Sequence, residues 1–178
     1  MHKLVFNDVV LFWMLHATEK LRRCTELVSR LLFERGNGDL AVKLLTSDAT
    51  YSFEEMRREG STTIWENWPH CIWDRSRNHP MFGAVISHLF DYLLGIREEA
   101  GTAGYSAIVI APVFVKKLNR LKGSRLLPAG EVSVSYKREN GSILVDIVVP
   151  ETLQAEFCYG GEQRLLKPGR HQFKVAEQ

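Results

Sequence analysis

The hydrophobic pattern of this chain changes its period a little past the middle, and this change constrains the fold more than any other feature. Up to Ile96, apolar residues recur in steps of three and four, as one face of an amphipathic helix requires. From Ala107 onward, apolar and polar residues alternate in short runs, as in half-buried strands. The sequence therefore predicts an α+β chain, with a helical segment over residues 1–97 and a small antiparallel β-sandwich over residues 104–178.

The first part of the chain is expected to hold three helices, over residues 9–33, 40–46 and 81–94. Asn7-Asp8 is the expected N-cap of the first helix, and Asp39 that of the second. Residues 49–59 are ambiguous, with Glu54–Arg58 fitting a single helical turn, and residues 60–80 are predicted to form an irregular loop. Three helices cannot bury their apolar faces without packing on other elements, so the segment is expected to be the end of a larger structure.

The second part of the chain is expected to consist of short strands joined by tight turns. Asn140-Gly141 is a sequence that two-residue hairpins favour, and it stands between two runs rich in β-branched residues. The predicted strands cover residues 107–111, 131–136, 143–149, 154–159, 164–166 and 171–175. Their number and spacing favour a sandwich of two antiparallel sheets.

Composition argues against several classes of protein. The chain has 178 residues, of which 45% are hydrophobic and 25% charged, as in ordinary globular domains. Cys24, Cys71 and Cys158 lie far apart and form no CxxC pair, which argues against a disulfide framework and a zinc site. No histidine pair has metal-ligand spacing, so neither a metal nor a cofactor is predicted. The apolar run over residues 9–15 is too short to span a bilayer, so no membrane partner is predicted, and the localisation stays open.

Charge is distributed unevenly along the chain, although the net value is only +2. The basic excess lies mainly in the run from Lys116 to Arg125. We interpret this run as a solvated loop or the exposed face of a strand, because no aromatic residues that would stack on bases are interleaved with it. Nucleic acid is therefore not a predicted partner. The alternative, an interaction domain that uses these charges, predicts salt-dependent binding to a generic duplex.

The strongest functional motif lies in the predicted loop, where Trp65-Glu66-Asn67-Trp68 places one carboxylate between two indoles. Asn78-His79 follows just before the third predicted helix. Aromatic faces stack on the apolar faces of sugars, and a carboxylate beside them can act as an acid or a base. A plainer interpretation makes both tryptophans core anchors and leaves Glu66 on the surface. Trp73 and His79 favour the sugar site, because loops dense in large aromatic residues often line pockets.

At these motifs the sequence resembles a known family. Gly60–Trp68 (GSTTIWENW), followed by Ser76–Gly83 (SRNHPMFG), looks like the carboxyl-terminal part of bacterial α-L-rhamnosidases. Asp39–Leu45 resembles the helix before that motif, Ala103–Pro112 the link into the last β-domain, and Glu131–Val149 the central hairpin of that domain. The resemblance implies the end of a catalytic toroid of six helical hairpins, followed by a β-sandwich.

The resemblance also implies roles for individual residues. Members of this family are glycoside hydrolases that release terminal rhamnose with inversion at the anomeric carbon. Glu66 is similar to the general base that activates the attacking water, and His79 is similar to a histidine that contacts the rhamnose. Trp65 and Trp68 would line the same pocket, with Asn78 as a further substrate-binding candidate. Inverting glycosidases place their two carboxyl groups about 6.5–9.5 Å apart, with water between the base and the sugar.

Departures from the family pattern shape the expected function. The family's general acid, and the acidic cluster that binds the sugar hydroxyls, belong to a stretch upstream of the one that this chain resembles. Residues 1–33 also lack the glycine- and threonine-rich turn that is usual in the family. We therefore expect a carboxyl-terminal fragment of an inverting α-L-rhamnosidase that keeps the base and is inactive alone. A rhamnose-containing glycan is its expected ligand only within a full catalytic domain, and exposed helical surface is expected to drive self-association.

A second class of function stays open at this stage, that of a non-catalytic carbohydrate-binding or structural module. The β-part carries few aromatic residues and no tryptophan. Sugar-binding sandwiches usually present exposed aromatic platforms, so this alternative ranks second. Titration of residues 101–178 with rhamnose-containing glycans distinguishes the two.

Overall fold

The computed structural model describes residues 25–70 and 76–177. They divide into two compact units, the first ending at Val85 and the second beginning at Ile86. Several features of the sequence lie outside the described residues, namely the expected cap Asn7-Asp8, most of the expected helix 9–33, Cys24, Cys71 and Trp73. Within the described residues, no helix combines the length and the apolar character needed to cross a membrane.

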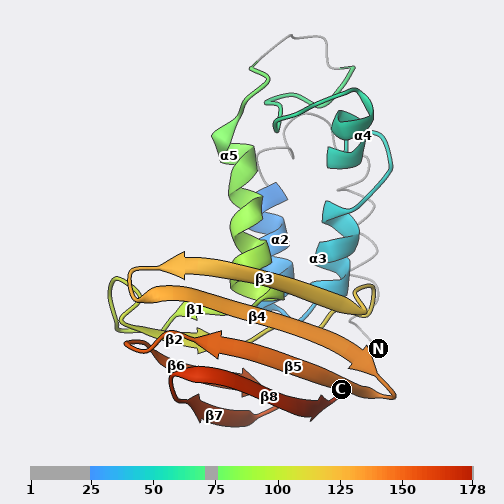
Figure 1. Cartoon of the computed structure of the whole chain (residues 1–178). Helices are drawn as coiled ribbons and strands as arrows, with labels where there is room; N and C mark the ends of the chain where they lie inside the picture. The colour runs from blue at the N-terminus through green and yellow to red at the C-terminus, as the bar shows by residue number, and fades with distance from the viewer. Residues whose placement is uncertain (1–24, 71–75, 178) are drawn as a thin grey trace. The chain divides into compact units, whose positions relative to one another are not determined.

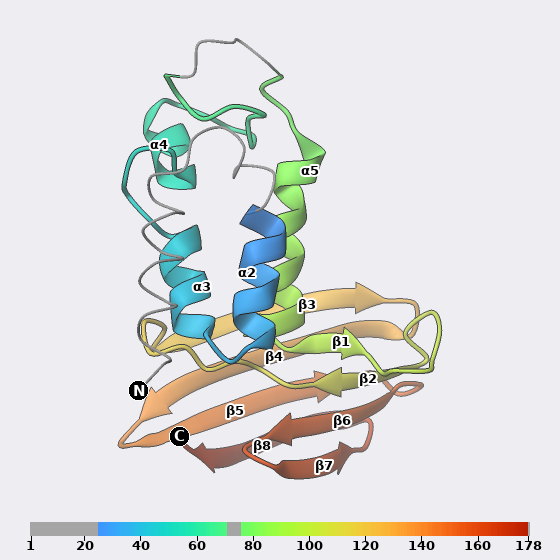
Figure 2. The same cartoon turned by 180° about the vertical axis from the view of Figure 1, so that it is seen from behind.

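The first unit is helical, as its period predicts. Its helices are α2 (Thr25–Glu34), α3 (Gly38–Leu45), α4 (Phe53–Arg58) and the short α5 (Pro80–Gly83) (Figure 1). Between α2 and α3, which lie side by side (Figure 2), the chain reverses at Gly36, whose φ is 74°. Among the described residues of the unit, the buried apolar side chains are Phe33, Ala41, Val42, Met56, Trp68, Phe82 and Val85. They come from all four helices, from the loop before α5 and from the turn after it, so the loop that carries the sequence motif is part of this core.

The start of α3 corrects one expectation. The helix begins at Gly38, two residues before the predicted start, and its N-cap is Asn37 rather than Asp39. The positive φ angle of Gly36 reverses the chain early, which leaves Asp39 in the first turn. A carboxylate in the first turn interacts favourably with the helix dipole, so Asp39 still supports the helix from a different position.

The third expected helix is helical throughout but changes its winding. It begins at Pro80, whose fixed φ angle suits the first helical position. A 3₁₀ turn, η2 (Ala84–Ile86), and a π turn, η3 (Leu89–Leu93), follow α5. Burial then runs without a break from Tyr92 to Ile96. A regular α-helix with one buried face does not bury consecutive residues. The chain therefore leaves α-helical winding where it enters the core of the second unit, to which Leu94 and Ile96 belong.

The second unit is the predicted β-sandwich. Its two four-stranded sheets have the orders β1-β2-β6-β7 and β3-β4-β5-β8 (Figures 1 and 2). The strands are β1 (Ile96–Glu98), β2 (Ala107–Ile110), β3 (Arg120–Leu127), β4 (Gly130–Glu139), β5 (Ser142–Val149), β6 (Gln154–Tyr159), β7 (Glu162–Leu166) and β8 (Gly169–Ala176). Neighbouring strands are antiparallel except β2 and β6, which pair in parallel. The predicted boundary, Arg97–Gly104, lies inside this unit, at the end of β1 and in the loop to β2.

Both sheets of the second unit bury one shared apolar core. β5 buries every second residue from Ile143 to Val149, and Phe157 of β6 contributes from the other sheet. Asn140 and Gly141 join β4 to β5 with φ angles of 50° and 74°, which is the geometry of a type I′ turn. The hairpin predicted from the sequence is therefore confirmed, together with the alternation that places its apolar face inward.

The structure contains two strands that the sequence pattern did not predict, β1 and β3. β3 covers most of the basic run, and Arg120 and Lys122 lie at its exposed positions. The less exposed positions between and after them include Gly123 and Arg125. Because neither of these residues is apolar, the alternation of period two is hidden in the sequence. A Cβ atom at Gly123 would lie 2.7 Å from the side chain of Leu94, so the missing side chain makes room for the core.

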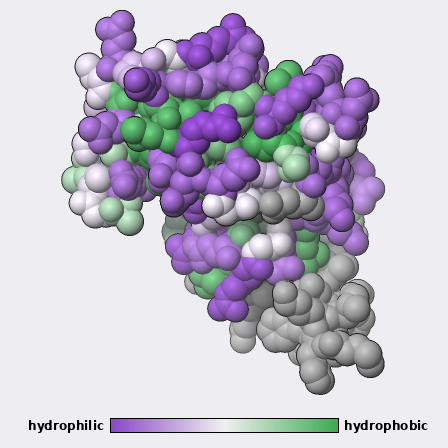
Figure 3. Space-filling view, turned by 90° about the horizontal axis from the view of Figure 1, so that it is seen from below, coloured by the Kyte–Doolittle hydropathy of each residue, from purple (hydrophilic) through white to green (hydrophobic). Residues whose placement is uncertain are grey.

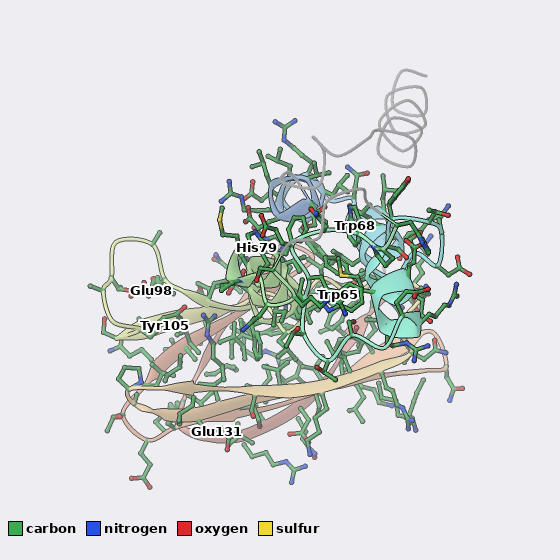
Figure 4. All side chains as sticks on the ribbon, turned by 90° about the horizontal axis from the view of Figure 1, so that it is seen from above. Trp65, Trp68, His79, Glu98, Tyr105 and Glu131 are labelled. Carbon is green, nitrogen blue, oxygen red and sulfur yellow. The ribbon has the colours of Figure 1, made fainter. Side chains whose placement is uncertain are left out.

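Arg125 links three parts of the second unit. Its guanidinium donates hydrogen bonds to the carboxylate of Asp91 in η3 (2.8 Å) and to the carbonyl of Ile96 (3.0 Å). It also lies 4.8 Å from the ring centroid of Tyr105, whose backbone N–H donates to the carboxylate of Glu98 (2.8 Å; Figure 4 labels both residues). At least this member of the basic run therefore serves the fold rather than an external partner.

At the β7–β8 side of the sandwich, a charged side chain covers aromatic residues of the core. The guanidinium of Arg164 lies 4.3 Å from the ring centroid of Phe173, and that ring packs edge-on against Phe157 at 4.8 Å. Figure 3 shows one face of the molecule, on which apolar side chains (green) gather in a band bordered by hydrophilic ones (purple). Arg164 thus shields an aromatic ring at the edge of the core, while Leu165 beside it is 74% exposed.

Tyr136 provides a test of the sandwich core. Its ring is buried against Phe114, and its hydroxyl has no hydrogen-bond partner among the described residues. Burying an unpaired hydroxyl costs about 1–3 kcal/mol, so Tyr136→Phe should leave the free energy of unfolding unchanged or raise it by about 1 kcal/mol at neutral pH. Urea unfolding measures the change. Tyr159→Phe is the matched control, since that ring also contacts Phe114 but is only partly buried.

The same substitution should alter the pH dependence of stability. Burial raises the pKa of Tyr136 to about 12, above the usual value of 10. The unfolded chain therefore loses this proton first, so the free energy of unfolding should be independent of this group below pH 10 and should fall as the pH rises toward 12. Tyr136→Phe should lack that loss. A clear destabilisation by Tyr136→Phe at neutral pH would show that the hydroxyl has a partner after all.

Candidate functional site

The loop that carries the sequence motif rests on α4. The Ser52 hydroxyl accepts a hydrogen bond from the backbone N–H of Glu55 (3.1 Å) and caps this helix. Phe53 in its first turn packs edge-on against Trp68, with ring centroids 5.3 Å apart, and Phe82 of α5 contacts the same indole at 5.8 Å. Trp68 is buried between these two rings. It is thus a core anchor of the loop, and its role in lining a pocket stays a prediction.

Two short segments of the loop pair through their backbones. The N–H of Glu66 donates to the carbonyl of Ser76 (2.8 Å), and the N–H of His79 donates to the carbonyl of Ile64 (2.8 Å). The hydroxyl of Thr63 donates to the carbonyl of Arg77. These bonds hold residues 63–66 beside residues 76–79, so the two motifs, thirteen residues apart in the sequence, form one local site.

His79 stands at the end of this pairing and at the start of α5. Its backbone is extended, with φ −119° and ψ 96°, as the proline that follows it favours. The imidazole lies edge-on to Phe82, with ring centroids 5.4 Å apart, and is only partly buried. Packing therefore fixes one side of the ring, while the other side reaches the surface of the unit, where Figure 4 labels it near Trp65 and Trp68.

Trp65 differs from Trp68 in its surroundings. It is partly exposed, and the guanidinium of Arg77 lies 4.9 Å from its ring centroid, in a cation–π contact. Glu66, the next residue, is also partly buried, whereas Asn78 is exposed. The sequence interpretation did not assign Arg77, Phe53 or Phe82 to the site. The signal was present for the two phenylalanines, which stand within or beside short helical patterns, but the Arg77 contact depends on a pairing that the sequence does not reveal.

The chemistry available here is that of one carboxylate, one imidazole and one partly exposed indole, all on the same loop. Across the described ranges, 25–70 and 76–177, no group of three or more His, Cys, Asp or Glu residues could hold a metal ion. The carboxylate of Glu66 is the candidate proton acceptor of this site, and its role stays a prediction.

Comparison with protein families defines the class. Residues 23–93 match the model of the bacterial alpha-L-rhamnosidase 6 hairpin glycosidase domain, and residues 95–174 match that of the bacterial alpha-L-rhamnosidase C-terminal domain. The two models meet between η3 and β1. The matched stretches are thus similar to part of a hairpin glycosidase domain and to the β-domain that follows it, and the chain as a whole resembles the carboxyl-terminal part of bacterial α-L-rhamnosidases.

Individual relatives agree with this resemblance. An alpha-L-rhamnosidase of Formosa agariphila is 32% identical over 140 residues, which are 74% of this chain and 15% of the relative. Those of Alteromonas sp. (strain LOR) and Streptomyces avermitilis are each 28% identical, over 75% and 71% of this chain and 15% and 13% of their own lengths. The chain therefore spans about one seventh of these relatives.

Solved structures show the same fold. The alpha-L-rhamnosidase of Aspergillus terreus superposes with a TM-score of 0.76 at 24% identity, covering 85% of this chain and 19% of that one. The enzyme of Dictyoglumus thermophilum gives 0.75 at 22% identity, covering 86% and 20%. The structure of the Streptomyces avermitilis enzyme complexed with L-rhamnose gives 0.74 at 24% identity, covering 85% and 17%. The prediction of a helical segment followed by a β-sandwich is confirmed.

Proposed function

We propose that this chain supplies the carboxyl-terminal part of an inverting α-L-rhamnosidase, with Glu66 as the general base and His79 as a contact to the rhamnose. The observation that carries the proposal is the pairing of residues 63–66 with residues 76–79. It joins the carboxylate motif to the histidine motif within the stretch that matches the glycosidase-domain model. The proposal thus assigns the reaction to a locally braced site rather than to scattered residues.

Each side chain has a distinct task in this proposal. In an inverting hydrolysis, a carboxylate takes a proton from water as the water attacks the anomeric carbon. Glu66 suits that task because its N–H donates to the carbonyl of Ser76, which fixes the backbone from which the carboxylate extends. His79 donates a hydrogen bond to a rhamnose hydroxyl. Trp65 offers its indole to the apolar face of the sugar, and Asn78 adds a polar contact at the rim.

The general acid belongs, in this proposal, to the part of the enzyme that the matched stretch does not span. That stretch is only 13–15% of the length of the relatives. General acid catalysis contributes about 10²–10⁴-fold to the rate of such reactions, and the rest of the sugar pocket contributes orientation on top of that. The isolated chain should therefore be inactive although its base is in place.

The alternative of a carbohydrate-binding module finds no support in the second unit. Among its described aromatic rings, Tyr136 and Phe157 are buried in the core, Tyr105 lies against Arg125, and Phe173 lies against Arg164. A flat sugar-binding platform needs exposed aromatic faces. We therefore do not assign glycan binding to the sandwich.

Hydrolysis of an aryl α-L-rhamnoside by the purified chain tests the proposal. We expect no release of the aryl group above the buffer rate, with or without Glu66→Gln. Turnover that disappears in Glu66→Gln would mean that an acid exists within the chain or in a second copy. The proposal that the acid lies elsewhere would then be wrong, while the role of Glu66 would stand.

A further inference from the structure

The end of the stretch that matches the glycosidase domain packs with the second unit. Residues 23–93 match the model of that domain, but the second compact unit already begins at Ile86. The π turn η3 therefore belongs to the glycosidase domain by sequence and to the β-sandwich by packing. Such a segment is the place where the β-domain of a complete enzyme can hold the catalytic domain.

A backbone hydrogen bond joins η3 to the loop after β2. Within the turn, the N–H of Leu94 donates to the carbonyl of Leu89 (2.9 Å), a spacing of five residues that is typical of π winding. The carbonyl of Tyr92 accepts from the N–H of Val113 (2.8 Å), which follows β2. The last carbonyl groups of a helix lack partners within the helix, so this bond satisfies one of them from the second unit.

Arg125 of β3 holds side chains of the same segment. Its guanidinium donates to the carboxylate of Asp91 (2.8 Å) and lies 6.0 Å from the ring centroid of Phe90. Arg125 and Asp91 are 27% and 30% exposed, so salt screens this pair less than a pair on the open surface. On the same strand, Gly123 leaves the space beside which the side chain of Leu94 lies. β3 thus offers a positive group and a gap, which match a carboxylate and an apolar side chain of the helical segment.

We propose that the second unit functions as a clamp on the end of the last helical segment of the glycosidase domain. We name Val113, Gly123 and Arg125 the η3 seat, and its occupant is the segment of residues 89–94. Arg125 is the residue that fastens the occupant. A cut between the two matched domains, after residue 94, would separate the occupant from its seat. The inference does not rest on the proposed function, because no sugar chemistry enters it.

Native-state hydrogen exchange of the whole chain at increasing urea concentrations shows with which unit η3 opens. We expect the amide of Leu94, which reports on the π turn, to exchange together with the amides of β5 in one cooperative opening. The amide of Thr46, which donates to the carbonyl of Val42 at the end of α3, reports on the first unit. Exchange of Leu94 together with Thr46, in an opening that leaves β5 protected, would overturn the proposal.

Arg125→Met tests the residue that fastens the segment. The variant keeps the apolar part of the side chain but loses the charged pair with Asp91. The amide of Leu94 should therefore exchange at least about tenfold faster relative to the amides of β5. Arg170→Met is the matched control, because Arg170 of β8 pairs with Asp146 of β5 (2.5 Å) and takes no part in the η3 seat. Equal relative exchange rates of Leu94 in the two variants would rule out the role of Arg125.

Gly123→Ala tests the seat through its shape and leaves every charge in place. A Cβ atom at Gly123 would lie 2.7 Å from the side chain of Leu94, so that side chain would have to move. The amide of Leu94 should then exchange about tenfold faster relative to the amides of β5. Ser124→Ala, at the exposed neighbouring position of β3, is the control and should leave the relative rate unchanged. Unchanged exchange of Leu94 in Gly123→Ala would show that β3 does not hold the segment.

Discussion

Gly95→Ala should destabilise the second unit by about 3 kcal/mol or more. Gly95 has a φ of 75°, a region that costs other residues about 1–2 kcal/mol. A Cβ atom there would also lie 2.3 Å from both the carbonyl carbon of Ala111 and the nitrogen of Pro112. Because both are backbone atoms, no side-chain rotation relieves the clash. The chain would have to separate where the N–H of Ala111 donates to the carbonyl of Gly95.

Hydrogen exchange at the amides of β5 measures this effect, because it reports the opening of the sandwich core alone. Gly101→Ala is the matched control. Its φ of 86° is similar, but no atom lies within 4 Å of the added methyl group, so it should show only the cost of the backbone conformation. Equal losses of protection in the two variants would contradict the close approach of Gly95 to the segment after β2.

Most of the β-part of the fold can be predicted from the sequence, because short-range sequence patterns determine its strands and turns. Alternation of period two over β5 and a turn sequence with two positive φ angles determine the hairpin at Asn140-Gly141 without reference to the rest of the chain. β3 was not predicted, for an equally local reason. Gly123 gives room to Leu94 and Arg125 pairs with Asp91, so two positions that should have been apolar serve contacts with the segment before β1.

The helical part was predicted less well because the start of α3 and the winding of the third predicted helix depart from a regular α-helix. The winding changes from α to 3₁₀ to π between residues 80 and 93, and burial of consecutive residues begins at Tyr92; a helical period predicts neither. The N-cap of α3 is Asn37 rather than Asp39 because a glycine turns the chain early.

For the candidate site, too, the sequence revealed some features and not others. Its residue types were visible in the sequence, since a carboxylate between indoles and a histidine before proline are chemical patterns. The pairing that brings Glu66 and His79 into one site was not visible, because it depends on backbone hydrogen bonds across a loop without periodicity. The burial of Trp68 against Phe53 likewise needs the position of α4, which the sequence left ambiguous.

The second large expected effect is a loss of activity in Glu66→Gln when this residue is part of a complete catalytic domain. The matching part of the Formosa agariphila enzyme, to which this chain is 32% identical over 140 residues, can be replaced by the present sequence. We expect the chimera to hydrolyse an aryl α-L-rhamnoside, because the relative supplies the acid and the rest of the pocket. Glu66→Gln should then lower kcat about 10²–10⁴-fold, since the amide cannot accept a proton from water. Glu59→Gln is the control, with the same chemical change at an exposed residue at the end of α4.

The kcat of this chimera with and without Glu66→Gln is therefore the measurement that tests the central claim most directly. Our account predicts an active chimera, a loss of at least about a hundredfold in Glu66→Gln, and no change in Glu59→Gln. An active chimera whose kcat is unaffected by Glu66→Gln would contradict the account, because the base would then have to be another residue.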